Sequence, residues 1–209
     1  MFDSPIHWEL AQDCKENVPR VTGRFFRNVS NSDCPNWMAK RLNAVGQRPI
    51  SALVDITNYI MIDLGRPLHA FDADKINGDT LFIRRAENEE KIFALNEKEY
   101  TCTSDMLVIG DRDGADDIAG IMGGQRTGIS NTTKNLFLEI AVFDPVSVAT
   151  TGRSLNIHSD ARYRFERGLD GESPDSLSGY IARFVQKICG GEISHTVSVG
   201  NGVKWQRKI

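Results

Sequence analysis

The chain has 209 residues, of which 40% are hydrophobic and 25% charged, which is the composition of an ordinary soluble globular protein. Its net charge of −3 excludes a chain that grips nucleic acid along its whole length, since such chains are usually basic, so any RNA contact should be local. No apolar run approaches the roughly 18 residues of a membrane span, and the N-terminus lacks a signal pattern. We therefore expect no membrane association and a cytoplasmic location.

The N-terminal part of the chain changes character at Arg20. Residues 1–19 mix charged and polar side chains without a period and are expected to be a linker or a loosely attached arm. Strand signals begin at Arg20. A helix is predicted from Pro35, with apolar side chains at helical spacing up to Gly46, and a second from Pro49 that Gly65 ends.

The middle of the chain reads as a series of short strands. Leu68–Asp72 is expected to be extended, and the runs LFIRRA, KIFAL, KEYTC and MLVIG follow, separated by polar turns. The acidic stretch Asp111–Asp117 is predicted to be a loop. Ile118–Met122 and Leu136–Val142 are the most apolar runs, so we expect both as strands in the middle of a sheet.

Helices return in the C-terminal third. One is predicted after Pro145 and another over Ser176–Cys189, followed by a strand over Glu192–Val199 and a polar tail at 200–209. Strands in mid-chain with helices at both ends predict a single α+β domain, with a central mixed, largely antiparallel sheet flanked by helices.

Glu139 interrupts the apolar run Leu136–Val142. A lone carboxylate in a buried strand costs several kcal/mol unless it is paired or hydrogen-bonded, as a rough estimate. It is either a structural acid paired with an arginine or an acid that faces a pocket, and the pattern alone does not decide. Alternation along the strand puts Phe137, Glu139 and Ala141 on one face, which would line that pocket.

Other candidate residues also have two readings. Gly120 and Gly123 could be packing points or bare backbone beside a ligand, since AGIMGG matches no phosphate-binding loop. His69 could be a core histidine or a site residue. Ser159 precedes Asp160, but no G-x-S-x-G elbow surrounds it, which disfavours a covalent serine nucleophile. No cysteine or histidine spacing suggests a metal.

Five motifs, taken together, resemble the central domain of the beta subunit of bacterial phenylalanyl-tRNA synthetase. They are RPISALVDITNYIMIDLGRPLHAFD, LVIGD, AGIMGG, LFLEIAVFDPVSV and HSDARYRFERGLD, in the same order and spacing. The resemblance covers about Arg20 to Val199, so residues 20–199 are expected to form this domain, as one part of a longer polypeptide.

The resemblance implies an editing site that hydrolyses tyrosine wrongly attached to tRNA(Phe). It implies the tRNA 3′ end and the alpha subunit of the complete ligase as partners, and no metal or cofactor in this domain, with ATP and Mg expected only for the complete ligase. Serine replaces the family's threonine before Asp-Ala, and Arg162 stands where a small residue is common. The implied catalytic residues are His69 and Ser159, and the implied substrate-binding residues are Arg48, Gly120, Gly123, Glu139 and Ala161.

The implied chemistry agrees with general rules of selectivity. An apolar pocket rejects an added hydroxyl by only about 10²-fold, whereas a pocket that hydrogen-bonds the hydroxyl rejects the analogue without it by roughly 10⁴-fold or more. A carboxylate such as Glu139 would accept a hydrogen bond from the phenol O–H of tyrosine. Two alternatives stay open: a non-catalytic RNA-binding or scaffold module of the same fold, and a freestanding trans-editing domain.

Overall fold

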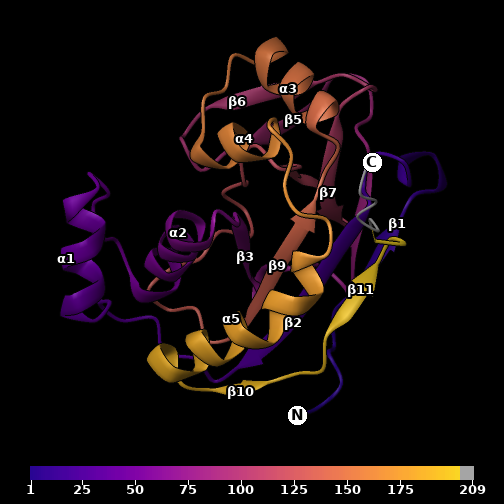
Figure 1. Cartoon of the computed structure of the whole chain (residues 1–209). Helices are drawn as coiled ribbons and strands as arrows, with labels where there is room; N and C mark the ends of the chain where they lie inside the picture. The colour runs from indigo at the N-terminus through magenta and orange to yellow at the C-terminus, as the bar shows by residue number, and fades with distance from the viewer. Residues whose placement is uncertain (203–209) are drawn as a thin grey trace, which may run out of the picture.

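The computed structural model describes residues 1–202, which form three layers with a five-stranded antiparallel sheet in the middle (Figure 1). In this sheet β9 lies between β2 and β3, and both β10 and β11 pair with the outer edge of β2. Of the tail predicted at 200–209, residues 203–209 fall outside the described residues. The strands are β2 (Arg20–Arg27), β3 (Leu68–Asp72), β9 (Leu136–Val142), β10 (Glu192–Ile193) and β11 (Val197–Val199).

β9 is the central strand, as the apolar run predicted, and all seven of its residues are buried. Its side chains alternate between two cores. Leu136, Leu138 and Ile140 face a core of helices, while Phe137 and Ala141 face a core shared with a second sheet. A strand covered on both faces needs apolar residues at nearly every position, which explains why six of its seven residues are apolar.

Three helices lie on one side of the five-stranded sheet; the second and third contact its strands, and the first packs against the second. The predicted stops are confirmed for the second of them, because Gly65 takes the left-handed conformation (φ 66°) directly after its last turn. These helices are α1 (Asn36–Ala44), α2 (Ala52–Leu64) and α5 (Ser173–Cys189).

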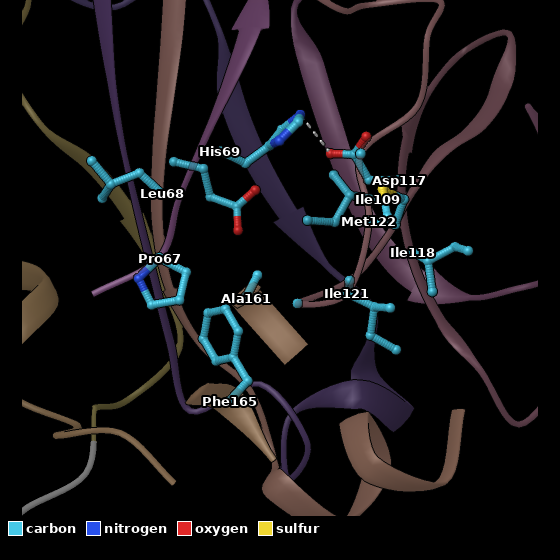
Figure 2. A pocket seen from close by; sticks show the side chains of 14 residues that line it. Pro67, Leu68, His69, Ile109, Asp117, Ile118, Ile121, Met122, Ala161 and Phe165 are labelled. Atoms are coloured by element: carbon cyan, nitrogen blue, oxygen red, sulfur yellow. Dashed lines mark ion pairs between the residues drawn. The ribbon is translucent and has the colours of Figure 1, made fainter. Parts of the chain in front are cut away.

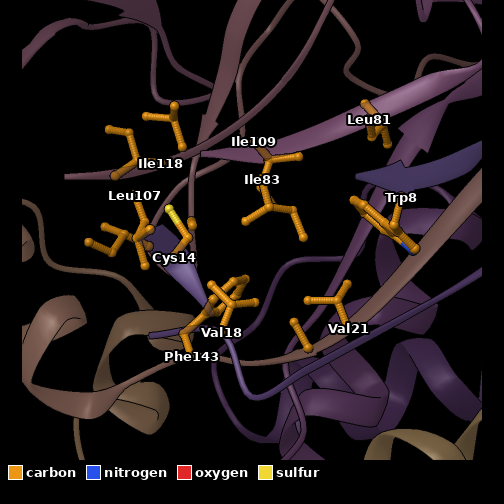
Figure 3. Close-up of a cluster of buried hydrophobic side chains, with 14 of the residues drawn as sticks. Trp8, Cys14, Val18, Val21, Leu81, Ile83, Leu107, Ile109, Ile118 and Phe143 are labelled. Atoms are coloured by element: carbon orange, nitrogen blue, oxygen red, sulfur yellow. The ribbon is translucent and has the colours of Figure 1, made fainter. Parts of the chain in front are cut away.

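A four-stranded sheet covers the opposite face, so the predicted single central sheet is two sheets that share one core (Figure 3). Within this second sheet only the β1–β4 pair is parallel. A separate hairpin, β5 with β6, lies beside it. The strands are β1 (His7–Leu10), β4 (Thr80–Arg85), β5 (Glu90–Phe93), β6 (Glu99–Cys102), β7 (Leu107–Asp111) and β8 (Gly114–Ile118).

The expectation that residues 1–19 form a linker is wrong. β1 pairs with β4, and a short 3₁₀ helix, η1 (Gln12–Cys14), follows it. Trp8, Cys14 and Val18 are buried in the core between the sheets (Figure 3). The segment is polar on one side only, and strands this short carry too little periodicity to be recognised from sequence.

The predictions of a loop over Asp111–Asp117 and of a strand over Ile118–Met122 are also wrong. The turn of the hairpin is at residues 112–113, and the acids at 116 and 117 lie inside β8. Ile118 and Met122 instead close a tight turn by exchanging two backbone hydrogen bonds, with Gly120 at φ 71° between them. A second 3₁₀ helix, η2 (Ala73–Lys75), follows β3.

Two further helices lie together at one end of the sheets, at the top of Figure 1. These are α3 (Pro145–Ser154) and α4 (Asp160–Phe165). Pro145 begins α3 as predicted, and the Asp144 side chain caps it by accepting from the Ser147 N–H at 2.7 Å. Their position brings α4 next to the turn at Gly120.

Candidate functional site

A cavity of about 70 Å³ lies where β3, β9, the 118–122 turn and α4 meet (Figure 2). By the same measure roughly 10–15 Å³ holds one water, so the space suits a group about the size of an aromatic ring. A shallower groove of about 300 Å³ adjoins it and shares several wall residues with it. Five predicted residues line the cavity: His69, Gly120, Gly123, Glu139 and Ala161.

Glu139 is one of two acids that line this cavity, and it has no partner within residues 1–202. The residue is 5% exposed, and its Oε2 atom makes no hydrogen bond. Within residues 1–202 no ion pair involves it, so the alternative of a structural acid paired with an arginine is wrong. Burial raises the pKa of Glu139 to about 8. The carboxyl is therefore an unused hydrogen-bonding group beside the cavity.

His69 stands directly across from Glu139, because the two are register partners in the β3–β9 pair. The ring lies edge-on against Phe71, with centroids 4.4 Å apart, and its side chain is 22% exposed. Its Nε2 atom lies 3.1 Å from Asp117 Oδ2, although that contact is off the hydrogen-bond axis of the ring. Burial lowers the pKa of His69 to about 4, which leaves the ring neutral at physiological pH.

Both predicted glycines have packing reasons as well as a place in the cavity wall. A Cβ on Gly120 would lie 2.8 Å from Phe143 Cδ2, and one on Gly123 would lie 2.3 Å from His69 Cε1. Across residues 1–202 the backbone N–H groups of both glycines lack an acceptor. These glycines can therefore serve both as packing points and as bare backbone beside a ligand. Without side chains they allow close packing and leave their N–H groups free at the cavity wall.

Ser159 lines the outer groove rather than the cavity. Its hydroxyl donates to the Ile121 carbonyl at 2.7 Å and accepts from the Arg162 N–H at 3.0 Å, which caps α4. The serine thus ties α4 to the cavity turn and holds Ala161 in the wall.

Arg162 is a buried structural residue. Its Nε atom lies 3.0 Å from Glu166 Oε2, and its guanidinium donates to the Ile157 carbonyl. A Cβ on Gly152 would lie 2.4 Å from the Arg162 side chain. The absence of a side chain at Gly152 therefore makes room for an arginine where a small residue was expected.

Arg48 is not brought to the cavity. It is exposed in the loop between α1 and α2 and lines neither the cavity nor the groove. Its neighbour Gln47 donates from Nε2 to Asp160 Oδ2 at 3.1 Å, which holds this loop against the start of α4. The predicted position at the edge of the pocket stays a prediction.

The sequence reasoning missed Asp117. This residue lies in the cavity wall next to His69, and its Oδ1 accepts the Gly124 N–H at 2.8 Å. The sequence did carry a signal for a buried Asp117, because Asp116 and Asp117 directly precede the apolar pair Ile118-Ala119. Residues that adjoin a buried pair are often part of the same strand.

Fold and cavity together define a single α+β domain with a small cavity between its sheets and α4. The chain belongs to the B3/4 domain family, whose model matches residues 17–190. Its curated relatives include the phenylalanine–tRNA ligase beta subunits of Ruegeria pomeroyi and Rhodospirillum rubrum. Both are 49% identical to this chain, the first over 95% of its length and the second over 100%. The chain spans about a quarter of the length of these relatives.

A solved structure has the same fold. It is an N-terminal fragment of the phenylalanyl-tRNA synthetase beta subunit from Pyrococcus horikoshii, with a TM-score of 0.59 and 13% identity, and the match covers 95% of this chain and 55% of that one. At this identity the likeness concerns the fold alone. No helix within residues 1–202 is long and apolar enough to cross a bilayer.

Proposed function

We propose that this domain is an editing site that hydrolyses the ester of tyrosine attached to tRNA(Phe), as part of a phenylalanine–tRNA ligase beta subunit. The single observation that carries the proposal is the unpaired carboxyl of Glu139, buried in a ring-sized cavity. In either protonation state this carboxyl keeps an oxygen that can accept from a phenol O–H. Phenylalanine would leave the buried group unsatisfied, which supports selection for tyrosine.

The other cavity residues suit ester hydrolysis by water. The free N–H groups of Gly120 and Gly123 are donors that can stabilise negative charge on an ester oxygen. His69 shares the cavity with Glu139 and is assigned to the ester end of the substrate. Ser159 is assigned a supporting role through its bond to the turn, since its hydroxyl already has two partners.

The proposed partners are the tRNA 3′ end carrying tyrosine and the alpha subunit of the complete ligase. The curated relatives, which are named as ligase beta subunits and are about four times longer, support both. The outer groove that continues from the cavity is a suitable path for the end of the tRNA. A non-catalytic module of the same fold would give the buried Glu139 no role and would bear an avoidable desolvation cost.

The test is the selectivity of Glu139→Ala within a full-length beta subunit assembled with its alpha subunit. Loss of the hydrogen bond costs about 0.5–1.5 kcal/mol when the carboxyl is neutral and about 1.5–3 kcal/mol when it is ionised, so hydrolysis of Tyr-tRNA(Phe) should fall about two- to a hundredfold. Hydrolysis of Phe-tRNA(Phe) should be no slower, and the aminoacylation rate serves as the control for correct assembly. Equal loss toward both esters in a folded variant would sink the proposal.

A further inference from the structure

Asp117 lies beside the ring of His69 in the cavity wall (Figure 2). It is 3% exposed and lies at the end of β8. One carboxyl oxygen, Oδ2, is 3.1 Å from His69 Nε2, and the other, Oδ1, accepts the Gly124 N–H at 2.8 Å. The backbone bond fixes which oxygen faces the histidine.

The His69 ring is also held on its other sides. Phe71 meets it edge-on, and the ring occupies the space that a side chain on Gly123 would need. Its Nδ1 atom makes no hydrogen bond within residues 1–202. Since the ring is confined, what Nδ1 offers to a ligand depends on which nitrogen carries the proton.

Within residues 1–202 no lysine or arginine pairs directly with Asp117, and the charge of Arg126 acts on it only as the weakest of the influences on its pKa. The nearby Arg126 lies 2.8 Å from Asp111 and 3.7 Å from Asp116, and within residues 1–202 it forms no ion pair with Asp117. Glu139 adds a further acid to the same site. Burial, and then the charge of Asp116, raise the pKa of Asp117 well above its usual range. A buried carboxyl in this position favours its neutral form.

We propose that Asp117 is a positioning residue that acts as a neutral carboxylic acid, donating its O–H to His69 Nε2 and so placing the ring proton on Nδ1. This inference rests on the proposed function. His69 would then present Nδ1–H to the ester carbonyl oxygen while a water oxygen bonds to the carbonyl carbon. The ester C–O bond breaks, and the ribose oxygen takes up the proton that the water loses. Hydrogen bonds in catalytic sites are often poorly aligned without a ligand and become shorter and better aligned when substrate binds. We expect the same of the contact between Asp117 and His69.

Two variants of Asp117 separate this role from simple packing, again in the assembled full-length protein. Asp117→Ala removes the donor, so hydrolysis of Tyr-tRNA(Phe) should fall about 10²-fold, the usual effect of losing an oxyanion donor. Asp117→Asn can accept from Gly124 with its oxygen and donate to Nε2 with its NH₂, so it should hydrolyse at least tenfold faster than the alanine variant. An asparagine variant as slow as alanine would overturn the proposal.

The pH profile provides a readout that a packing role would not change. Hydrolysis by the unmodified protein should fall at alkaline pH as Asp117 loses its proton, and this step should be missing from Asp117→Asn. Asp116→Asn is the matched control, because Asp116 hydrogen-bonds Thr127 and does not touch His69. It should keep the alkaline step, moved to lower pH because the charge of Asp116 no longer raises the pKa of Asp117. Glu139, with its pKa of about 8, adds a titration of its own in every variant, so the profile of Asp117→Asn is compared with that of the unmodified protein. Identical alkaline profiles of Asp117→Asn and the unmodified protein would refute the inference.

The tautomer itself can be measured without any activity. In the chain labelled with ¹⁵N-histidine, the four histidines give separate signals, and a His69→Gln variant assigns the relevant one. We expect the Nδ1–H form for His69, and the Nε2–H form would overturn the assignment of Asp117. If no ester is hydrolysed by the unmodified protein while the Nδ1–H form is found, the proposed function fails and the Asp117–His69 contact stands.

Discussion

Replacing Glu139 with glutamine should remove part of the loss of stability at alkaline pH. In the folded chain burial raises the pKa of Glu139 to about 8, while an unfolded glutamate titrates near about 4.3. The contribution of this carboxyl to stability is therefore fully present below about pH 4.3. It is lost progressively as the pH rises to about 8, because only the unfolded state releases its proton in that interval.

His69 has the opposite dependence, and this decides where the measurement should be made. Its pKa falls to about 4 in the fold, against about 6.5 in the unfolded chain, so its contribution increases as the pH rises from about 4 to 6.5. The two trends oppose each other below pH 6.5. Above it the slope of Glu139 remains, at about 1.4 kcal/mol per pH unit, or about 2 kcal/mol between pH 6.5 and 8.

The assay is urea unfolding of the chain and of Glu139→Gln at half-unit steps from pH 6.5 to 8. The free energy of unfolding of the unmodified chain should fall across this range by up to about 2 kcal/mol more than that of the variant. Asp117 contributes in both proteins, and the loss of the Glu139 charge lowers the pKa of Asp117 in the variant, which flattens the slope of the variant in the same direction. Glu192→Gln is the control, since Glu192 is an exposed acid paired with Arg27, which lowers its pKa, and should leave the slope unchanged. Parallel slopes for the chain and Glu139→Gln would refute the buried, unpaired state of Glu139.

Three further predictions concern the same site and its partner. Gly123→Ala should slow hydrolysis about tenfold or more, because its Cβ would lie 2.3 Å from His69 Cε1 and displace the ring; a variant with unchanged rate would contradict the packing. His69→Ala should lower the rate of Tyr-tRNA(Phe) hydrolysis about 10²-fold while keeping the preference for tyrosine over phenylalanine, and a lower melting temperature with normal hydrolysis would instead indicate a core histidine. The isolated chain should bind tRNA more weakly than micromolar at physiological salt, as measured by filter binding, because a chain of net charge −3 offers few phosphate contacts, and tighter binding would refute this.

The sequence alone determined the elements whose patterns are long and regular. Leu136–Val142 was predicted as a central strand because both of its faces had to be apolar, and the helix ending at Gly65 was predicted from its period and its stop. The motif order also indicated which residues share the pocket, including Glu139 and Gly123. The strand and the helix are predictable because each rests on information carried within one stretch of chain, whereas the shared pocket follows from the family resemblance.

Features that depend on contacts between residues far apart in the sequence became evident only from the tertiary structure. β1 joins the core because His7–Leu10 pairs with residues 80–83, a contact that no local period reveals. Asp117 was read as part of a loop because acids are usually exposed, yet its strand places it against His69. The free carboxyl of Glu139 also became evident only in three dimensions, because whether a buried acid has a partner depends on which side chains the fold brings within reach.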